Sequence, residues 1–185
     1  ENAPENANPV ILTESTYTEK GNYPASTKDA RGNVVSQTVN PKDGTLESVT
    51  DPTGQTVNYT YDASKRVTGV TTTGDGKTYK NAYTYENDRI KTVSHNTTGD
   101  AADVTYTFHY DELGRKASVQ VGSQTLSTNV YENDRDGQLS EVQYGNGGKV
   151  HYTYDDFDRL TGVRYDAETG DRYVYRYGAN GAAAE

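Results

Sequence analysis

The chain has 185 residues, a formal net charge of −9 and no cysteine, which excludes disulfides and thiolate metal sites. Leu, Ile, Val and Phe supply only 27 of the 185 residues, a share at which a charged chain is ordinarily disordered, and the acidic balance argues against nucleic acid as a partner. No segment approaches the ~20 apolar residues that span a bilayer, whereas the 17 tyrosines, with many Thr and Val, favour a pleated, half-buried β surface.

Residues 1–15 are rich in Asn, Ala and Pro and are predicted to form a linker or N-terminal extension, whose apolar triplet 10–12 docks on the first strand. The chain begins without Met and shows no signal-peptide pattern, which favours a piece of a larger protein. Residues 182–185 are interpreted as a tail.

Two series of turn signals alternate between these ends. One falls near residues 19, 41, 62, 86, 111, 132, 155 and 178, and the other near 29, 51, 74, 99, 122, 145 and 167. Successive turns on opposite edges of a ribbon predict about seven β-hairpins over residues 16–181, and no 3.6-residue apolar pattern is long enough for a helix. The predicted fold is therefore all-β, an extended and twisted antiparallel strip of tandem hairpins.

An aromatic residue followed by an acid recurs along the chain. The copies are Tyr61-Asp62, Tyr85-Glu86, Tyr110-Asp111, Tyr131-Glu132 and Tyr154-Asp155. The tyrosines are 24, 25, 21 and 23 residues apart, and each copy is followed by a short segment that ends in Val. A fixed period of this length indicates an array of one supersecondary unit.

These residues resemble the RHS repeat, also called the tyrosine–aspartate (YD) repeat, with its pattern YxYDxxGR. Tyr110-Asp111-Glu112-Leu113-Gly114-Arg115 fits fully, whereas the copies that end at Arg66 and Arg159 lack the Gly. The resemblance covers about residues 16–181. It implies a β-strip, which in the family spirals into a hollow shell around a C-terminal toxin or other cargo.

Alternation places the tyrosines of each strand on one face, where equivalent rings of neighbouring hairpins are expected to form ladders. The arginine of each turn is expected to lie over the next Tyr row as a cation–π contact. One feature resists this interpretation: Leu160 and Val163 are three residues apart and would face opposite ways. A bulge at Gly69 or Gly162 would return both to one face, but other copies lack that Gly.

The residues assigned to the repeat framework are those of the tyrosine rows and turns. They are Tyr59, Tyr61, Asp62, Arg66, Tyr83, Tyr85, Arg89, Tyr110, Asp111, Gly114, Arg115, Tyr131, Tyr152, Tyr154, Asp155, Arg159, Tyr173 and Tyr175.

No catalytic constellation is predicted. The histidines 95, 109 and 151 fall at unrelated points of the repeat, and acids in turns ordinarily accept hydrogen bonds from backbone N–H groups. The best metal candidate is Glu132, Asp134 and Asp136. A calcium loop requires Glu at its twelfth position, but this chain has Gln143 there, so a solvated turn is favoured. The sequons at Asn58 and Asn96 are interpreted as chance matches. No cofactor is expected.

The resemblance implies a non-enzymatic scaffold, a segment of an RHS-type shell or cell-surface stalk that encloses or presents cargo. It further implies a secreted or surface location in a bacterium, Gram-positive by this analogy, and the rest of a larger chain as partner. The alternative is an adhesion module whose exposed tyrosines bind surface glycan or a protein partner. Unpaired strands at the two ends, near residues 16–28 and 171–177, also predict edge-to-edge self-association.

Overall fold

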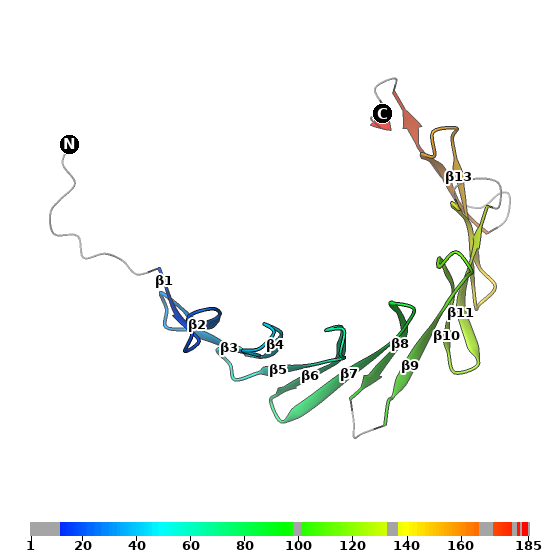
Figure 1. Ribbon diagram of the computed structural model, residues 1–185. Helices are drawn as coiled ribbons and strands as arrows, with labels where there is room; N and C mark the ends of the chain where they lie inside the picture. The colour runs from blue at the N-terminus through cyan, green and yellow to red at the C-terminus, as the bar shows by residue number, and fades with distance from the viewer. Residues whose placement is uncertain are drawn as a thin grey trace, which may run out of the picture. The chain divides into compact units, whose positions relative to one another are not determined.

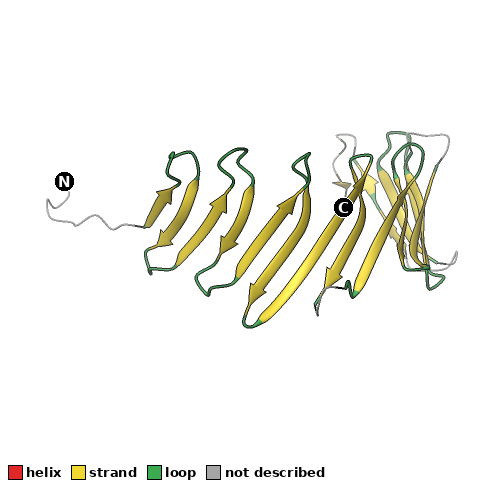
Figure 2. Ribbon diagram, turned by 60° about the horizontal axis from the view of Figure 1, so that its bottom comes forward, coloured by secondary structure: helices red, strands yellow, loops and turns green. Residues whose placement is uncertain are grey.

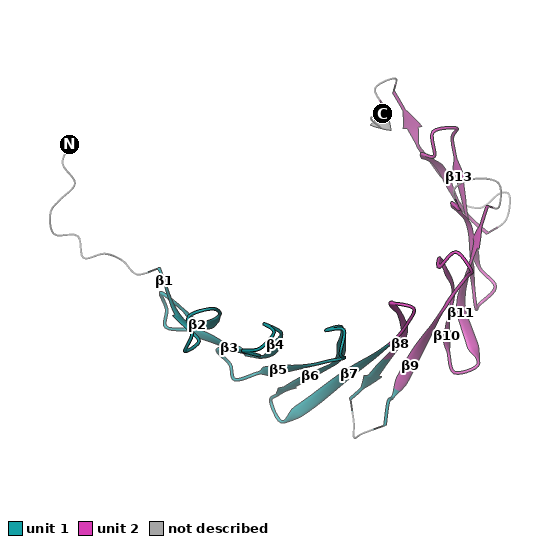
Figure 3. Cartoon of the chain, viewed as in Figure 1, with its two compact units in different colours: residues 1–84, 94–103 teal, residues 85–93, 104–185 magenta. Residues whose placement is uncertain are grey.

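A computed structural model describes residues 12–97, 101–132, 137–166, 172–178, 181, 183 and 184. Throughout these residues all regular secondary structure is β-strand, as the turn pattern predicted. The chain divides into two compact units, residues 1–84 with 94–103 and residues 85–93 with 104–185 (Figure 3). Most of the predicted N-terminal extension and two residues of the predicted tail lie outside the described residues.

The strands follow one another in chain order (Figure 1). In the first unit they are β1 (Thr13–Tyr17), β2 (Pro24–Asp29), β3 (Val34–Val39), β4 (Leu46–Thr50), β5 (Thr56–Tyr61) and β6 (Val67–Gly74). β7 (Lys77–Glu86) and β8 (Arg89–Asn96) have residues in both units. In the second they are β9 (Val104–Tyr110), β10 (Lys116–Val121), β11 (Gln124–Tyr131), β12 (Leu139–Tyr144), β13 (Lys149–Tyr154), β14 (Leu160–Tyr165), β15 (Arg172–Val174), β16 (Arg176–Tyr177) and β17 (Ala183–Ala184).

The sheet is an antiparallel meander. Its order runs from β1 to β15 without a crossover, while β16 and β17 form a separate two-stranded ribbon. In the first unit the turns alternate between the two edges of the sheet (Figure 2). Among the described residues β1 pairs only with β2, and β15 only with β14, so the sheet is not closed. The predicted all-β antiparallel strip is confirmed, and the structure adds that the strip is open.

A β-bulge beside the turn 155–159 resolves the spacing of Leu160 and Val163. Tyr154 pairs with Leu160 and Tyr152 with Val163, which leaves Thr161 as the extra residue. Since both pairs then lie on one face, the aliphatic residue and the valine join the tyrosine row. The predicted position of the bulge at Gly162 was wrong by one residue.

The same bulge occurs where the glycine is absent. The extra residue is Glu47 in β4, Ala117 in β10 and Ser140 in β12, whereas in β6, which keeps its glycine, it is Thr68. Glycine has a different role: Gly69 and Gly162 lie directly opposite Thr60 and Thr153, and a Cβ at either would approach the threonine hydroxyl to 2.6 and 2.7 Å. The bulge is therefore a property of the repeat rather than of its glycine.

The apolar packing is thin. Val150, 4% exposed, is the one buried hydrophobic side chain among the described residues, and it pairs with Val142 on one side and Tyr165 on the other. Stability must therefore come from many half-buried contacts along the sheet.

None of the described residues forms a helix long and apolar enough to cross a membrane.

The two end strands motivate a first prediction. β1 and β15 each present one row of backbone N–H and C=O groups without a neighbouring strand among the described residues, and such edges pair readily with other chains. We expect light scattering to show a mass that rises with concentration. Replacing Ser15 in β1 with Pro, which removes an edge donor, should suppress this rise, whereas a strictly monomeric profile of the original chain would contradict the prediction.

Candidate functional site

Each turn that begins at the Asp of a Tyr-Asp pair is closed by its own Asp and Arg; these turns are residues 62–66, 111–115 and 155–159. In the turn 155–159, Asp155 Oδ1 accepts the backbone N–H groups of Phe157 and Arg159 at 2.9 and 3.0 Å. Its Oδ2 accepts Arg159 Nε at 2.8 Å and lies 2.7 Å from Nη2. The carboxylate thus satisfies the turn backbone and fixes the direction of the arginine at once.

The turn is repeated with the same geometry elsewhere. Asp62 holds Arg66, and Asp111 holds Arg115, each through a 2.7 Å bond to Nε. On the opposite edge Asp29 and Asp51 organise turns of the same length, in which Asn33 and Gln55 take the place of the arginine at the fifth position. Aspartate closes the turn at both edges, but among these five turns only those that follow a tyrosine add an Asp–Arg ion pair.

The fourth turn residue has a left-handed backbone. φ is +78° at Gly114, and it is +63° at Lys65 and +62° at Asp158, where the glycine is missing. We expect Lys65→Gly to raise the free energy of unfolding by about 0.5–1 kcal/mol, because it removes left-handed strain of ~1–2 kcal/mol against an entropic cost of ~0.5–1 kcal/mol. Urea denaturation measures this change, and Lys42→Gly, outside this turn class, is the control. A destabilised K65G chain would contradict the prediction.

A tyrosine hydroxyl joins each turn to the preceding repeat. Tyr154 donates to the carbonyl of Leu139 at 3.0 Å. The backbone pairing of β12 with β13 runs to Glu141 and His151, so the hydroxyl continues the hydrogen-bonded ladder toward the bulged end of β12. The alternating pattern predicted a ring at this position but not the hydrogen bond.

The same bond recurs at the other copies and links residues 15 to 20 positions apart. The pairs are Tyr61 with Leu46, Tyr110 with Ile90, Tyr131 with Lys116, Tyr154 with Leu139 and Tyr177 with Leu160, at 2.7 to 3.0 Å. We call these five contacts the inter-repeat tyrosine bonds. In four of the five the acceptor is the first residue of the strand after a turn.

The arginine of one turn extends onto the next repeat. Arg115 lies 4.2 Å from the ring centre of Tyr131, Arg89 lies 5.7 Å from that of Tyr110, and Arg159 lies 4.5 Å from that of Tyr177. This is the arrangement expected from the sequence. The guanidinium of Arg89 also lies over Gly114, where a Cβ would come within 2.0 Å of Nη2. A side chain at this position would therefore have to displace Arg89 as well as adopt a strained φ.

Two copies depart from the turn. At Tyr85-Glu86 the two linking residues, Asn87 and Asp88, have φ of +50° and +61°, as in a two-residue type I′ hairpin, and Glu86 binds Lys91 at 3.0 Å. Glu132 forms a backbone bond with Gln138 across the longer turn. The other two candidate metal ligands, Asp134 and Asp136, lie outside the described residues, and no group of three potential ligands is found within them.

In the last copy the predicted tyrosine pair, Tyr173 and Tyr175, lies two residues before the pair that is equivalent in the structure. Tyr173 pairs with Val163 and is 60% exposed, whereas Tyr177, which is absent from the predicted framework, forms the inter-repeat bond. The signature was missed because Gly178 replaces the aspartate. The structurally equivalent pair is therefore Tyr175 and Tyr177.

The remaining predicted rings are Tyr85 and the first members of three pairs. Tyr59 and Tyr152 lie opposite Val70 and Val163, and Tyr83 and Tyr85 are half-buried on β7. The equivalent position before Tyr110 is Phe108, opposite Val119. A phenylalanine here indicates that packing, rather than the hydroxyl, is what the first ring supplies.

The histidines bond to polar partners on neighbouring strands. His95 contacts Asn81 at 2.8 Å, His109 contacts Gln120 at 3.1 Å, and His151 contacts Glu141 at 3.0 Å. Each contact joins adjacent strands, so these histidines act as cross-strand polar pairs.

The turns predict a pH dependence of stability. The Arg159 side chain lowers the pKa of Asp155 below its ordinary 3.8, and the backbone N–H of Arg66 does the same for the pKa of Asp62. A depressed carboxyl pKa gives stability that is present above the unfolded value and lost as pH falls through the folded one. Burial raises the pKa of Tyr154 above its ordinary 10.0, so its contribution is lost as pH rises through the folded value.

We therefore expect stability to be flat between about pH 5 and 9 and to fall on both sides. Urea midpoints from about pH 3 to about pH 11 measure the profile, because both limbs lie outside the flat range. Asp62→Asn with Asp155→Asn should flatten the acid limb, because the amide can still accept the turn N–H groups but does not titrate. An unchanged acid limb in this double variant would contradict the assignment.

These features define a tandem β-hairpin repeat protein in which five tyrosine hydroxyls and three arginines join neighbouring repeats. The RHS repeat family model matches residues 41–78 and 134–169. These two segments of the chain thus match the RHS repeat, which agrees with the resemblance in the YD motifs.

Solved structures show the same fold. A crystal structure of TcdB2-TccC3-TEV has a TM-score of 0.68 and 17% identity over 89% of this chain. A crystal structure of TcdB2-TccC3 without the hypervariable C-terminal region has a TM-score of 0.60 and 15% identity over 92% of this chain. The chain spans about 10% and 11% of those two chains. No curated protein matches its sequence.

Proposed function

We propose that the chain is a non-enzymatic structural segment of a larger RHS-repeat wall or stalk that encloses or presents a cargo outside the cell. The observation that carries this proposal is the series of inter-repeat tyrosine bonds, reinforced by the stacked arginines. Such contacts bond each hairpin to its predecessor and build a continuous wall with little apolar core. The fold shared with TcdB2-TccC3 structures supports the proposal.

The test is protease protection in the full-length parent chain. We expect the parent regions outside the repeats to resist a soluble protease while the wall is intact. Replacing Tyr61, Tyr154 and Tyr177 with Phe should expose these regions to cleavage at a denaturant concentration that leaves the original parent protected. Equal cleavage in the original and the variant, or an enzymatic activity retained by the repeat segment alone, would contradict the proposal.

A glycan-binding or partner-binding module is the second candidate, because three exposed tyrosines lie on the sheet face that carries the buried Val150. Tyr144, Tyr165 and Tyr173 are 45%, 46% and 60% exposed, and Tyr165 and Tyr173 contact edge to face at 6.3 Å. Saturable binding on a glycan array that is lost in Tyr173→Ala would favour this function. Tyr17→Ala, at an equally exposed ring in β1, is the matched control and should leave binding unchanged.

A further inference from the structure

Two arginines face each other on the surface opposite the tyrosine row. Arg164 of β14 pairs directly with Arg172 of β15, and His151 of β13 continues the same row. Like charges directly opposite in a sheet are destabilising. Among the described residues no carboxylate lies within 4.0 Å of either guanidinium, although the chain carries a net charge of −9.

The carboxylate in this row is already engaged. Glu141 lies opposite His151, and its oxygens contact His151 Nδ1 at 3.0 Å, Lys149 Nζ at 3.2 Å and Gln143 Nε2 at 2.6 Å. Glu141 therefore has three donors of its own. The arginine pair is left as the positive end of the row.

The repeat itself does not require this pair. In the equivalent copy, where Gly69 occupies the place of Gly162, the matching cross-strand positions hold Thr71 and Lys80. A single positive charge in that row is compatible with the same bulge and the same glycine. The second arginine thus needs a reason other than the fold.

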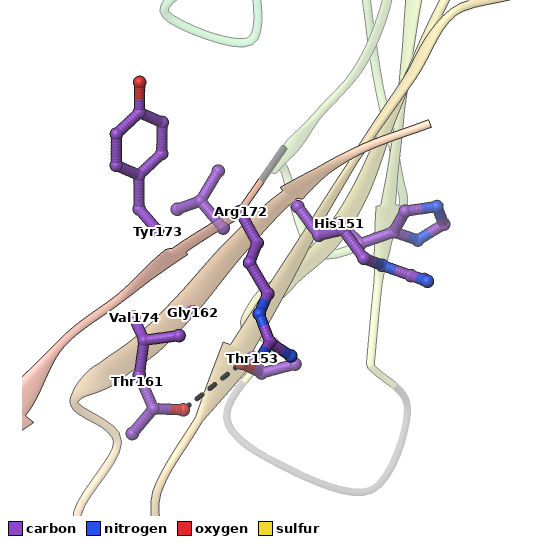
Figure 4. Close-up of a pocket in the computed structure, with 9 residues that line it drawn as sticks. His151, Thr153, Thr161, Gly162, Arg172, Tyr173 and Val174 are labelled. Atoms are coloured by element: carbon purple, nitrogen blue, oxygen red, sulfur yellow. Dashed lines mark hydrogen bonds between the residues drawn. The ribbon is translucent and has the colours of Figure 1, made fainter. Parts of the chain in front are cut away.

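A groove lies beside the arginines. Its floor is Gly162, whose missing side chain leaves a hollow between Thr153 on β13 and Val174 on β15. The cavity volume is about 460 Å³, within the range of small-molecule sites. The Arg172 side chain runs across the groove toward Thr153, while Tyr173 points away from it (Figure 4).

We propose that this groove binds a small organic anion, a carboxylate or phosphate monoester on a compact apolar body. The guanidinium groups of Arg164 and Arg172 would hold the anionic group, since their planar donor sets match such oxygens. The body would lie over Gly162 against Val174 and the methyl groups of Thr153 and Thr161. The bound anion would remove the repulsion between the two arginines.

The test is an NMR titration of the ¹⁵N-labelled chain with benzoate, and with benzamide as the uncharged analogue of the same shape. We expect benzoate to shift the amides of Thr153, Gly162 and Val174 saturably, with an affinity that falls as salt is raised. Benzamide should leave the chemical shifts of these amides unchanged. Phenyl phosphate tests whether the site accepts either oxyanion on the same ring.

Arg172→Gln and Arg164→Gln should each weaken benzoate binding about tenfold or more, as loss of a charge-assisted hydrogen bond does. Arg164 lies on an internal strand, so its variant separates loss of binding from fraying of β15. Arg31→Gln, with the same charge change in an exposed turn of the other unit, should bind like the original chain. Equal shifts with benzamide, shifts spread over the whole sheet, or unaltered affinity in both groove variants would overturn the proposal.

Discussion

Alanine at Gly114 is expected to destabilise the chain by about 2 kcal/mol, roughly twice the effect of alanine at Gly32. Both glycines occupy the fourth position of the same kind of turn, with φ of +78° and +89°, so the backbone strain is shared. The surroundings differ: a Cβ at Gly32 meets no atom within 4 Å, whereas at Gly114 it would come within 2.0 Å of Arg89. Arg89 would have to leave the Tyr110 ring.

Urea denaturation of the two variants measures this difference. A double-mutant cycle with Arg89→Ala sharpens it, because the excess cost at Gly114 should vanish once the arginine is gone, with a coupling of about 0.5–1 kcal/mol. The destabilisation caused by Gly32→Ala should be the same with and without Arg89→Ala. Equal costs for the two glycines would show that φ alone decides the turn and that the contact with the preceding repeat contributes nothing.

Removal of three inter-repeat hydroxyls is expected to lower the free energy of unfolding by about 3 kcal/mol, at ~1 kcal/mol for each hydrogen bond. The variant carries Tyr61→Phe, Tyr154→Phe and Tyr177→Phe, which keeps every ring and removes only the donors to Leu46, Leu139 and Leu160. The costs should add because the sites share no partner. A loss of this size is a large part of the stability of an ordinary domain.

The control variant changes the ring two residues earlier in each pair: Tyr59→Phe, Tyr152→Phe and Tyr175→Phe. Tyr59 and Tyr152 lie opposite valines, as Phe108 does at the equivalent position of another copy. We expect a change within about 0.5 kcal/mol, typical of substitutions that remove no specific contact. Thermal and urea unfolding of both variants provide the comparison, and similar losses in the two sets would contradict the role assigned to the hydroxyls.

The two predictions concern one mechanism. A conventional domain is stabilised by a core, but here Val150 is the one buried apolar side chain among the described residues. Neighbouring hairpins are instead joined by five tyrosine hydroxyls, and three guanidinium groups lie over rings of the next repeat. Stability is then a sum of neighbour contacts along the strip, and a wall can be lengthened by adding copies without redesigning a core.

The sequence by itself determined the fold class and the positions of the turns. Period-2 aromatic runs between Asp- and Gly-rich turns leave few arrangements other than a meander of hairpins, and the Asp–Arg spacing of four residues within a turn is local enough to be predicted. The stacking of Arg115 over Tyr131 also followed from the repeat, since consecutive hairpins must be neighbours.

The tertiary structure alone decided which atoms join one repeat to the next. Three features depend on cross-strand register. They are the bulge at Thr161 rather than Gly162, the bond from Tyr154 to Leu139, and the use of Tyr177 rather than Tyr173 for the inter-repeat bond of the last copy. A shift of one residue turns every side chain to the other face, and the register is fixed by contacts between residues some 15 to 20 positions apart. Periodicity within a strand carries no information about those contacts.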